Sequence, residues 1–365
     1  MSRSYKNLPS LTGGRGVAAL FVAIHHGCLV WGGALTPIGN VGWLGVSYFF
    51  ILSGFVLTWA FSSDRPYREF ILYRIARIYP LHLVTLLASL AAFAIIGSPL
   101  AGYVGTRFGT ITQFFLAHDF IPGHPEIRQS WNGVSWSLSA ELFFYLLAPW
   151  LISNLDKVGE SNLLRIGQAL YLLHLTIGVL AENFQFLRVY DFMQYHPIAY
   201  MPTFIYGIIA AIFIRRGRLV SLGADVKLLL FLPIFFYVFH NDARNVVVMI
   251  DLCIPPFLAI IIGGATSDLK EKRTILSHGL IEKIGEASFS LYMTHALLLG
   301  VMAPIFKRLN VGWFPTLKIL VFLVCSLLLS WLVYRWIELP SRRYFLAAVG
   351  LGRPRKQLLY GDARD

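Results

Sequence analysis

Cysteine and charged residues are both scarce in this chain. Its three cysteines, Cys28, Cys253 and Cys325, lie in apolar segments and lack the paired spacing of a metal site. This excludes a disulfide framework and favours buried core positions. Charged residues make up 14% of the 365 positions and hydrophobic residues 56%, with a mean hydropathy of +0.64. A soluble globule of this size needs more polar surface, so the composition predicts a membrane protein.

Acidic residues are particularly few, with 19 Asp and Glu against 31 Lys and Arg, a net charge of +12. In a soluble protein this charge would favour a nucleic-acid partner. In a membrane protein its distribution between loops matters more, and we predict no nucleic-acid partner. Residues 1–12 also lack a small-residue cleavage site beyond the first apolar run, so we expect that run to remain as an anchor.

Ten apolar stretches are long enough, or nearly long enough, to span a bilayer. They lie at about 15–33, 41–61, 78–97, 133–153, 163–182, 199–214, 226–240, 246–264, 284–305 and 316–337. An even number places both termini on one side. Segments on that side hold 22 of the 31 Lys and Arg, whereas the opposite loops hold 7. The positive-inside rule then predicts an all-α polytopic protein with both termini in the cytoplasm.

The first apolar run is unusual because it contains Arg15, His25 and His26. A helix rises about 1.5 Å per residue, so His26 would lie roughly 16 Å beyond Arg15. That depth is near the middle of a hydrocarbon core about 30 Å thick. Ionisable groups are expensive at this depth and usually functional. Adjacent residues point about 100° apart on a helix, so we expect only one of the two histidines to face a cavity.

Two other ionisable residues reach a similar depth from other spans. Glu141 lies about 12 Å inward from Gly133 at the outer face, and His295 lies about 16 Å from the cytoplasmic end of its span. Each lone buried group would cost several kcal/mol, so the match in depth predicts one shared polar cavity. We expect Glu141 to pair with His26 there; a structural carboxylate bonded to neighbouring Ser or Trp groups is the alternative.

Arg74 and Arg77 are three residues apart and share a helix face at the predicted cytoplasmic surface. A positive-inside anchor on lipid phosphates would explain them. A binding site for a phosphorylated ligand would also explain these two arginines, because guanidinium groups bind phosphate oxygens in bidentate fashion. Ser53 and Gly54, a small pair inside a span, favour close helix contact. The polar residues of the outer loop 98–132 are irregularly spaced, so no metal site is predicted.

Five blocks of the chain, in this order, resemble the bacterial acyltransferase-3 family of integral membrane O-acyltransferases. The blocks are 11–16 with His25 and His26, 49–55, 74–80, 136–145, and 285–295 with Glu338, Leu339 and Pro340. The chain departs from the usual family pattern at Thr12 and Gly14. The resemblance covers residues 11 to about 343 and predicts a single membrane-embedded acyltransferase domain over 1–343, with a basic cytoplasmic tail over 344–365.

The resemblance implies transfer of an acyl group, commonly acetyl from coenzyme A, to a hydroxyl of a glycan or similar acceptor. His26 matches the family's essential histidine, with His25 as the alternative, and Arg15 matches its partner arginine. Arg74 and Arg77 match its arginine pair, which we expect to hold the donor's phosphates.

A neutral His26 would take the proton of the acceptor hydroxyl. Glu141 would orient the imidazole, while His295 would bind the acceptor or stabilise the oxyanion. A relay in which His26 itself carries the acyl group stays open. No tightly bound cofactor is expected, and acetyl-CoA is a substrate in this interpretation.

Two other classes of protein share these features. A secondary transporter also places charged groups at mid-membrane, but the chain shows no internal repeat. A non-catalytic export or receptor protein would explain the hydrophobicity alone. Donor binding at Arg74 and Arg77 distinguishes the enzyme from both. The predicted location is the bacterial inner membrane, in a multi-pass arrangement.

Overall fold

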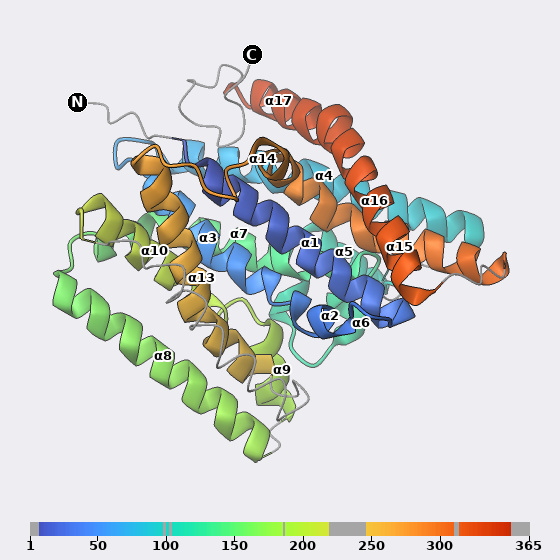
Figure 1. The fold of residues 1–365 in the computed structure, drawn as a ribbon, viewed down its shortest axis with the longest axis horizontal. Helices are drawn as coiled ribbons and strands as arrows, with labels where there is room; N and C mark the ends of the chain where they lie inside the picture. Colours follow the sequence, from blue (N-terminus) through green and yellow to red (C-terminus); the bar gives the residue numbers. More distant parts are fainter. Residues whose placement is uncertain are drawn as a thin grey trace.

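The computed structural model describes residues 7–97, 100–101, 104–184, 187–218, 246–309 and 314–351. Every regular element among these residues is a helix, which confirms the all-α prediction. Helix α1 (Pro9–Trp31) runs through the middle of the bundle, with α8 (Glu160–Asn183) at one edge and α16 (Pro315–Val333) on the opposite side (Figure 1).

The other helices follow the chain around α1. They are α2 (Thr36–Gly42), α3 (Gly45–Trp59), α4 (Tyr67–Ile96), α5 (Arg107–Phe114), η1 (His118–Phe120), α6 (Pro125–Arg128), η2 (Gly133–Ser135), α7 (Trp136–Leu155), α9 (Leu187–Tyr195), α10 (Met201–Arg215), α13 (Val246–Leu269), α14 (Gly279–Glu286), α15 (Ser288–Arg308), the π-helix η3 (Tyr334–Glu338) and α17 (Leu339–Ala348).

Seven helical segments of the described residues are long and apolar enough to cross a membrane. They are Pro9–Trp31, Tyr67–Ile96, Gly133–Leu155, Glu160–Ala181, Val247–Leu269, Ser288–Arg308 and Pro315–Ala348. The pair α2 and α3, bent by 42°, adds an eighth if it counts as one span, whereas α10 is shorter.

These helices indicate a multi-pass membrane protein. The predicted stretch at 226–240 lies outside the described residues, so the count of ten is not confirmed. The side on which the termini lie stays a prediction. Helix α17 continues to Ala348, beyond the predicted domain end at 343, and its Leu346 packs against Tyr73 and Ala76 of α4.

Glycines let the central helices approach closely. A methyl group on Gly16 of α1 would overlap the backbone of Gly285 in α14, and a methyl group on Gly285 would overlap the carbonyl of Thr12 in α1. Gly54 of α3 and Gly207 of α10 do the same against the carbonyls of Phe204 and Ile51. The interpretation of Gly54 as a helix contact is therefore confirmed. Close backbone contact of this kind is how helices gain packing energy in a membrane.

Helix α13 contains Asp251 and, one turn later, Pro255 and Pro256. A proline inside a helix removes a backbone hydrogen bond, yet this helix is continuous from Val246 to Leu269. Both carboxylate oxygens of Asp251 lie 2.8 and 2.9 Å from Nδ1 of the buried His174 on α8. This pair ties α8 to α13 and explains Asp251 as a structural contact.

Candidate active site

Two cavities are stacked along the helices α1, α3 and α15. We call the first the arginine cavity, because Arg15, Arg74 and Arg77 line it together with Glu141 and Tyr145. We call the second the histidine cavity, because His25 and His26 line it. Their volumes are about 90 and 610 Å³, respectively. Arg15 and His26 lie eleven residues apart on α1, about 16 Å along the helix axis, so α1 serves both cavities.

The arginine cavity gathers three guanidinium groups from two helices. Arg15 comes from α1, and Arg74 and Arg77 come from neighbouring turns of α4, as their spacing predicts. None of the three forms a hydrogen bond or an ion pair with another residue in the part of the chain that the structure describes. Arg74 does lie over the ring of Phe70, at 5.4 Å from its centre. Unpaired guanidinium groups around a cavity favour an anionic ligand with several acceptor oxygens.

Two carboxylates lie near these arginines, and each has a hydroxyl partner. Glu141 accepts a hydrogen bond from the Tyr145 hydroxyl, one turn along α7. Buried Glu338, at the end of the π-helix η3, accepts one from Ser290 Oγ at 2.5 Å. Both act electrostatically on Arg15. They reduce the mutual repulsion of the arginines without closing on them, which leaves the guanidinium groups available.

The histidine cavity presents both imidazoles of the pair, so the expectation that only one would face a cavity was wrong. The cavity wraps around the exposed side of α1, because Leu29 and Val30 also line it. His25 Nδ1 lies 2.7 Å from the carbonyl oxygen of Gly39, to which it donates, and so ties α1 to α2. His25 thus has an evident structural role beside its place in the cavity.

His26 and His295 contact each other across α1 and α15. His26 Nδ1 lies 2.9 Å from the Val22 carbonyl and 3.2 Å from His295 Nε2. His295 Nδ1 lies 3.0 Å from the Leu291 carbonyl. Because a carbonyl only accepts, both Nδ1 atoms must carry hydrogen in the neutral rings. His295 Nε2 then accepts the His26 Nδ1 hydrogen, and His26 Nε2 keeps its lone pair.

That lone pair makes His26 the available base of this cavity. Its Nε2 atom has no hydrogen-bond partner within the described ranges. A hydroxyl arriving there meets an acceptor whose tautomer is fixed from behind by Val22 and His295. His295 itself is fully buried and lines neither cavity in the described part. His295 is therefore placed to position His26, and its expected contact with the acceptor or the oxyanion stays a prediction.

The predicted pairing of His26 with Glu141 was wrong. Glu141 lies in the arginine cavity and bonds to Tyr145, whereas His26 pairs with His295. Depth along the helix axis fixes the height of a side chain in the bilayer but not the direction in which it points. Two of the three residues expected at one depth meet, and the third faces the other cavity.

Val46 and Tyr292 separate the two cavities, since both side chains line both of them. The Tyr292 hydroxyl lies 2.9 Å from the carbonyl oxygen of Val134, to which it donates, and 2.8 Å from Ser137 Oγ. We call Val46 and Tyr292 the septum. A group that passes from the arginine cavity to His26 meets these two side chains first.

Aromatic side chains form much of the wall of the histidine cavity, namely Trp43, Trp136, Tyr195, Tyr200 and Tyr292. Trp136 lies with its ring centre 5.4 Å from that of Tyr195 and 5.6 Å from that of Tyr200. Arg128 places its guanidinium carbon 3.5 Å from the centre of the Tyr195 ring. The wall is thus a packed group of rings, one of which is in contact with a cation.

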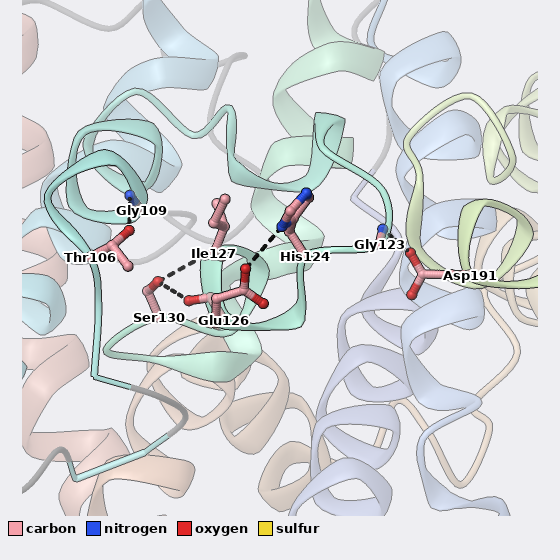
Figure 2. A network of polar contacts seen from close by, with 8 residues as sticks. All are labelled: Thr106, Gly109, Gly123, His124, Glu126, Ile127, Ser130 and Asp191. Atoms are coloured by element: carbon pink, nitrogen blue, oxygen red, sulfur yellow. Dashed lines mark hydrogen bonds and ion pairs between the residues drawn. The ribbon is translucent and has the colours of Figure 1, made fainter. Parts of the chain in front are cut away.

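The outer loop is fastened to α9 beside this wall. Asp191 accepts a hydrogen bond from the Gly123 backbone at 2.6 Å (Figure 2). It accepts another from Arg128 Nη1 at 2.9 Å. His124 and Glu126 form an exposed pair at 2.9 Å, and Ser130 bonds back to the carbonyls of Glu126 and Ile127 (Figure 2). In the described residues, no three His, Cys, Asp or Glu side chains could hold a metal ion.

Asp119 and His118 are buried beneath this loop. Neither carboxylate oxygen of Asp119 has a hydrogen-bond partner in the described residues, and burial raises the pKa of Asp119 well above its usual value. Burial lowers the pKa of His118 to about 3, so the ring is neutral at physiological pH. The fold of the outer loop therefore disfavours charge on both of these side chains.

Sequence reasoning missed the septum and Tyr145 as parts of the site. Tyr145 follows Glu141 by four residues, a spacing that places both on one helix face and could have predicted their contact. Val46 and Tyr292 gave no such signal, because an apolar and an aromatic residue inside a span usually belong to the core. Glu338 appeared only as part of a family block, without a partner.

Comparison with known proteins assigns this chain to a family. A family model described as an acyltransferase domain, acyltransferase-3, matches residues 8–335. Acyltransferase MdmB of Streptomyces mycarofaciens is 30% identical over 310 residues, covering 80% of this chain and 79% of that protein. A putative acetyltransferase, ORF330, of Acidianus two-tailed virus is 26% identical over 322 residues, covering 83% and 87%.

A longer relative gives the same class of activity. The putative O-acetyltransferase SACOL0978 of Staphylococcus aureus (strain COL) is 21% identical over 95% of this chain, which spans 59% of that protein. No solved structure matches the chain. The family match over most of the chain confirms the resemblance drawn from the five blocks: the chain belongs to the acyltransferase-3 family and is a multi-pass membrane acyltransferase.

Proposed function

We propose that the protein transfers an acetyl group from cytoplasmic acetyl-CoA to a hydroxyl of a glycan or similar acceptor at the outer face of the bacterial inner membrane. The single observation behind this proposal is the pair of stacked cavities. One holds three arginines without ion-pair partners in the described residues, and the other holds a histidine with a free lone pair. A transporter or receptor could use the anion site, but it would not need a base such as His26 in a second cavity.

The donor side of the proposal rests on the arginines. Coenzyme A carries phosphates on a nucleotide joined to a slender pantetheine arm that ends in the thioester. The arginine cavity, at about 90 Å³, is well below the roughly 300 to 1,000 Å³ of sites that enclose a whole drug-sized ligand. It suits the arm, with Arg15, Arg74 and Arg77 holding phosphate oxygens and the nucleotide at the cytoplasmic mouth. Glu141 then orders this cavity through Tyr145.

The chemical step follows from the assignment of hydrogens on His26. Its Nε2 takes the proton of the acceptor hydroxyl while the alkoxide oxygen bonds to the thioester carbonyl carbon. The carbon–sulfur bond breaks in collapse of the tetrahedral intermediate, and the proton passes to the departing coenzyme A thiolate. His295 and the Val22 carbonyl accept from Nδ1 and so stabilise the imidazolium that forms between these events.

A comparison of two donors tests the proposal directly. Acetyl-CoA and S-acetylpantetheine carry the same thioester, but only the first has phosphates. Wild type in lipid nanodiscs should consume radiolabelled acetyl-CoA at a KM at least tenfold lower than that of S-acetylpantetheine, with label passing to a mixed acceptor pool. Arg74→Ala should abolish this preference. If wild type neither binds nor consumes acetyl-CoA while it remains folded, the coenzyme A assignment is wrong.

A further inference from the structure

The histidine cavity is almost free of formal charge. Among the described residues that line it there is no Asp, Glu, Lys or Arg. Its polar groups are the two imidazoles, tyrosine hydroxyls, the Ser47 hydroxyl and the side-chain amides of Gln129 and Gln194. The arginine cavity, on the other side of the septum, has four charged side chains in a much smaller volume. The contrast points to ligands of different charge.

A charged acceptor would be disfavoured in such a cavity. A carboxylate or an ammonium group that leaves water needs a partner of opposite charge or several directed hydrogen bonds. Hydroxyl groups, in contrast, both donate and accept, as do the amides of Gln129 and Gln194 and the tyrosine hydroxyls. The lining therefore matches a ligand whose polar groups are hydroxyls.

The aromatic wall adds a preference for shape. Trp136 meets Tyr200 at an angle of 42° and Tyr195 at 88°, so the wall offers ring surfaces in several orientations. Flat apolar surfaces pack best against ligands that have an apolar face of their own. A sugar ring has such a face of C–H groups with hydroxyls around its edge. At about 610 Å³, the cavity falls within the roughly 300 to 1,000 Å³ of small-molecule sites.

Aromatic walls also attract cations, and the structure argues against that alternative. The guanidinium group of Arg128 already lies over Tyr195 and is held by Asp191, and neither of these two charged residues lines the cavity. A second cation would meet this positive charge with no carboxylate among the described lining residues to offset it.

We propose that the histidine cavity binds an uncharged, ring-shaped hydroxylic acceptor, a neutral sugar ring in the first instance, packed on Trp136 with one hydroxyl at His26 Nε2. This assigns the class of acceptor and makes Trp136 and Gln129 specificity-determining residues. It rests on the proposed function only for the reaction at His26, since the selectivity arises from the wall.

A binding experiment without donor tests this selectivity apart from catalysis. The protein in nanodiscs is incubated with an equimolar mixture of phenyl glycosides: glucoside, galactoside and rhamnoside, the matching glucuronide and galacturonide, and the 2-amino analogues. Retained compounds are measured by mass spectrometry. We expect the neutral members to be enriched at least tenfold over their uronide and amino counterparts, and Trp136→Ala to lose the enrichment. Trp150→Ala is the matched control, because Trp150 lies on the same helix and is 65% exposed.

A change of charge in the wall provides the second arm. Gln129→Lys should shift retention towards the uronides and Gln129→Glu towards the amino glycosides. The proposal is overturned if wild type retains charged members as well as neutral ones, or if no glycoside is retained above the level of Trp136→Ala. If wild type retains neutral glycosides selectively but does not consume acetyl-CoA, the donor assignment is wrong and the acceptor proposal stands. The two failures are therefore distinguishable.

Discussion

The arginine cavity and the histidine cavity share the helices α1, α3, α7 and α15, yet they differ in nearly every chemical respect. One has about 90 Å³ and three guanidinium groups; the other has about 610 Å³, aromatic walls and neutral imidazoles. Three turns of α1 are enough to pass from one to the other. In the proposed function, this difference in charge and size keeps the phosphorylated donor in the arginine cavity and the uncharged acceptor in the histidine cavity.

The largest expected effect comes from removing the base of the histidine cavity. His26→Ala should lower turnover by about 10² to 10⁴, the usual contribution of a general base, with acetyl-CoA binding unchanged. His25→Ala should stay within about tenfold of wild type, because His25 donates to Gly39 and its loss weakens only that contact. Turnover measured in nanodiscs decides between them. Equal losses in the two variants would mean that the histidines act as a unit.

The second largest effect is expected in the arginine cavity, where donor binding is weakened. Arg74→Ala should raise the KM for acetyl-CoA by about 10 to 100-fold, the value of one lost charged hydrogen bond. Arg74→Lys should restore little, because an ammonium group cannot reproduce bidentate binding. Arg68→Ala is the control, an exposed arginine on the same helix. An equal rise in KM for S-acetylpantetheine would argue that Arg74 supports the fold of the cavity and does not hold phosphate.

A change at the septum tests whether the cavities communicate. Val46→Trp should fill the space beside Tyr292 and lower transfer by about tenfold or more, with donor binding kept. Val46→Ala, which leaves the passage wider, should keep transfer and increase the hydrolysis of acetyl-CoA. Transfer and hydrolysis are measured together from one radiolabelled donor. Unchanged transfer in Val46→Trp would mean that the thioester reaches His26 by another route.

A smaller effect concerns the positioning of His26. His295→Ala should lower kcat by about tenfold with the KM values of both substrates nearly unchanged, since His295 lines neither cavity in the described part. His295→Gln should recover part of kcat, because its amide oxygen can accept the His26 Nδ1 hydrogen. A rise in acceptor KM without a fall in kcat would restore the expected role of His295 in acceptor binding.

The smallest effect lies outside both cavities, in the outer loop. The raised pKa of Asp119 means that the folded state disfavours its ionised form. As pH rises, Asp119 loses its proton at a lower pH in the unfolded chain than in the folded protein. The free energy of unfolding of wild type therefore falls as pH rises above the ordinary pKa range of a carboxyl group. Asp119→Asn should therefore raise the melting temperature by a few degrees, about 2 to 4 °C per kcal/mol, at pH 7.5 and by less at pH 4. A variant less stable at pH 7.5 would indicate an ionised, partnered carboxylate.

The sequence could predict the arginine cavity better than the histidine cavity. Arg74 and Arg77 share a face by spacing alone, whereas the family blocks paired Arg15 with His26 and did not place it beside them; the structure does. For His26, the depth argument selected His295 correctly and Glu141 wrongly. Depth depends only on residue count, whereas the direction of a side chain depends on helix rotation, which packing against neighbours sets.

The same limit explains the rest of the fold. Gly54 could be interpreted as a contact point because glycine has few other uses inside a span. Its partner Gly207 could not be identified, since nothing in either segment specifies which helix lies beside which. The septum could not be predicted for a related reason. Val46 and Tyr292 stand out only because both cavities meet at these two residues, and the sequence does not indicate where cavities lie.

The septum has a consequence for the cell as well as for the reaction. In the proposed topology, one cavity opens to the cytoplasm and the other to the outside, so Val46 and Tyr292 are the last barrier between two compartments. Each ion that leaked through would dissipate about 2.3 kcal/mol per 100 mV of membrane potential. The hydrogen bonds from Tyr292 to Val134 and Ser137 fix one of its two side chains in place. An enzyme that passes an acetyl group across a membrane must do so without becoming a channel.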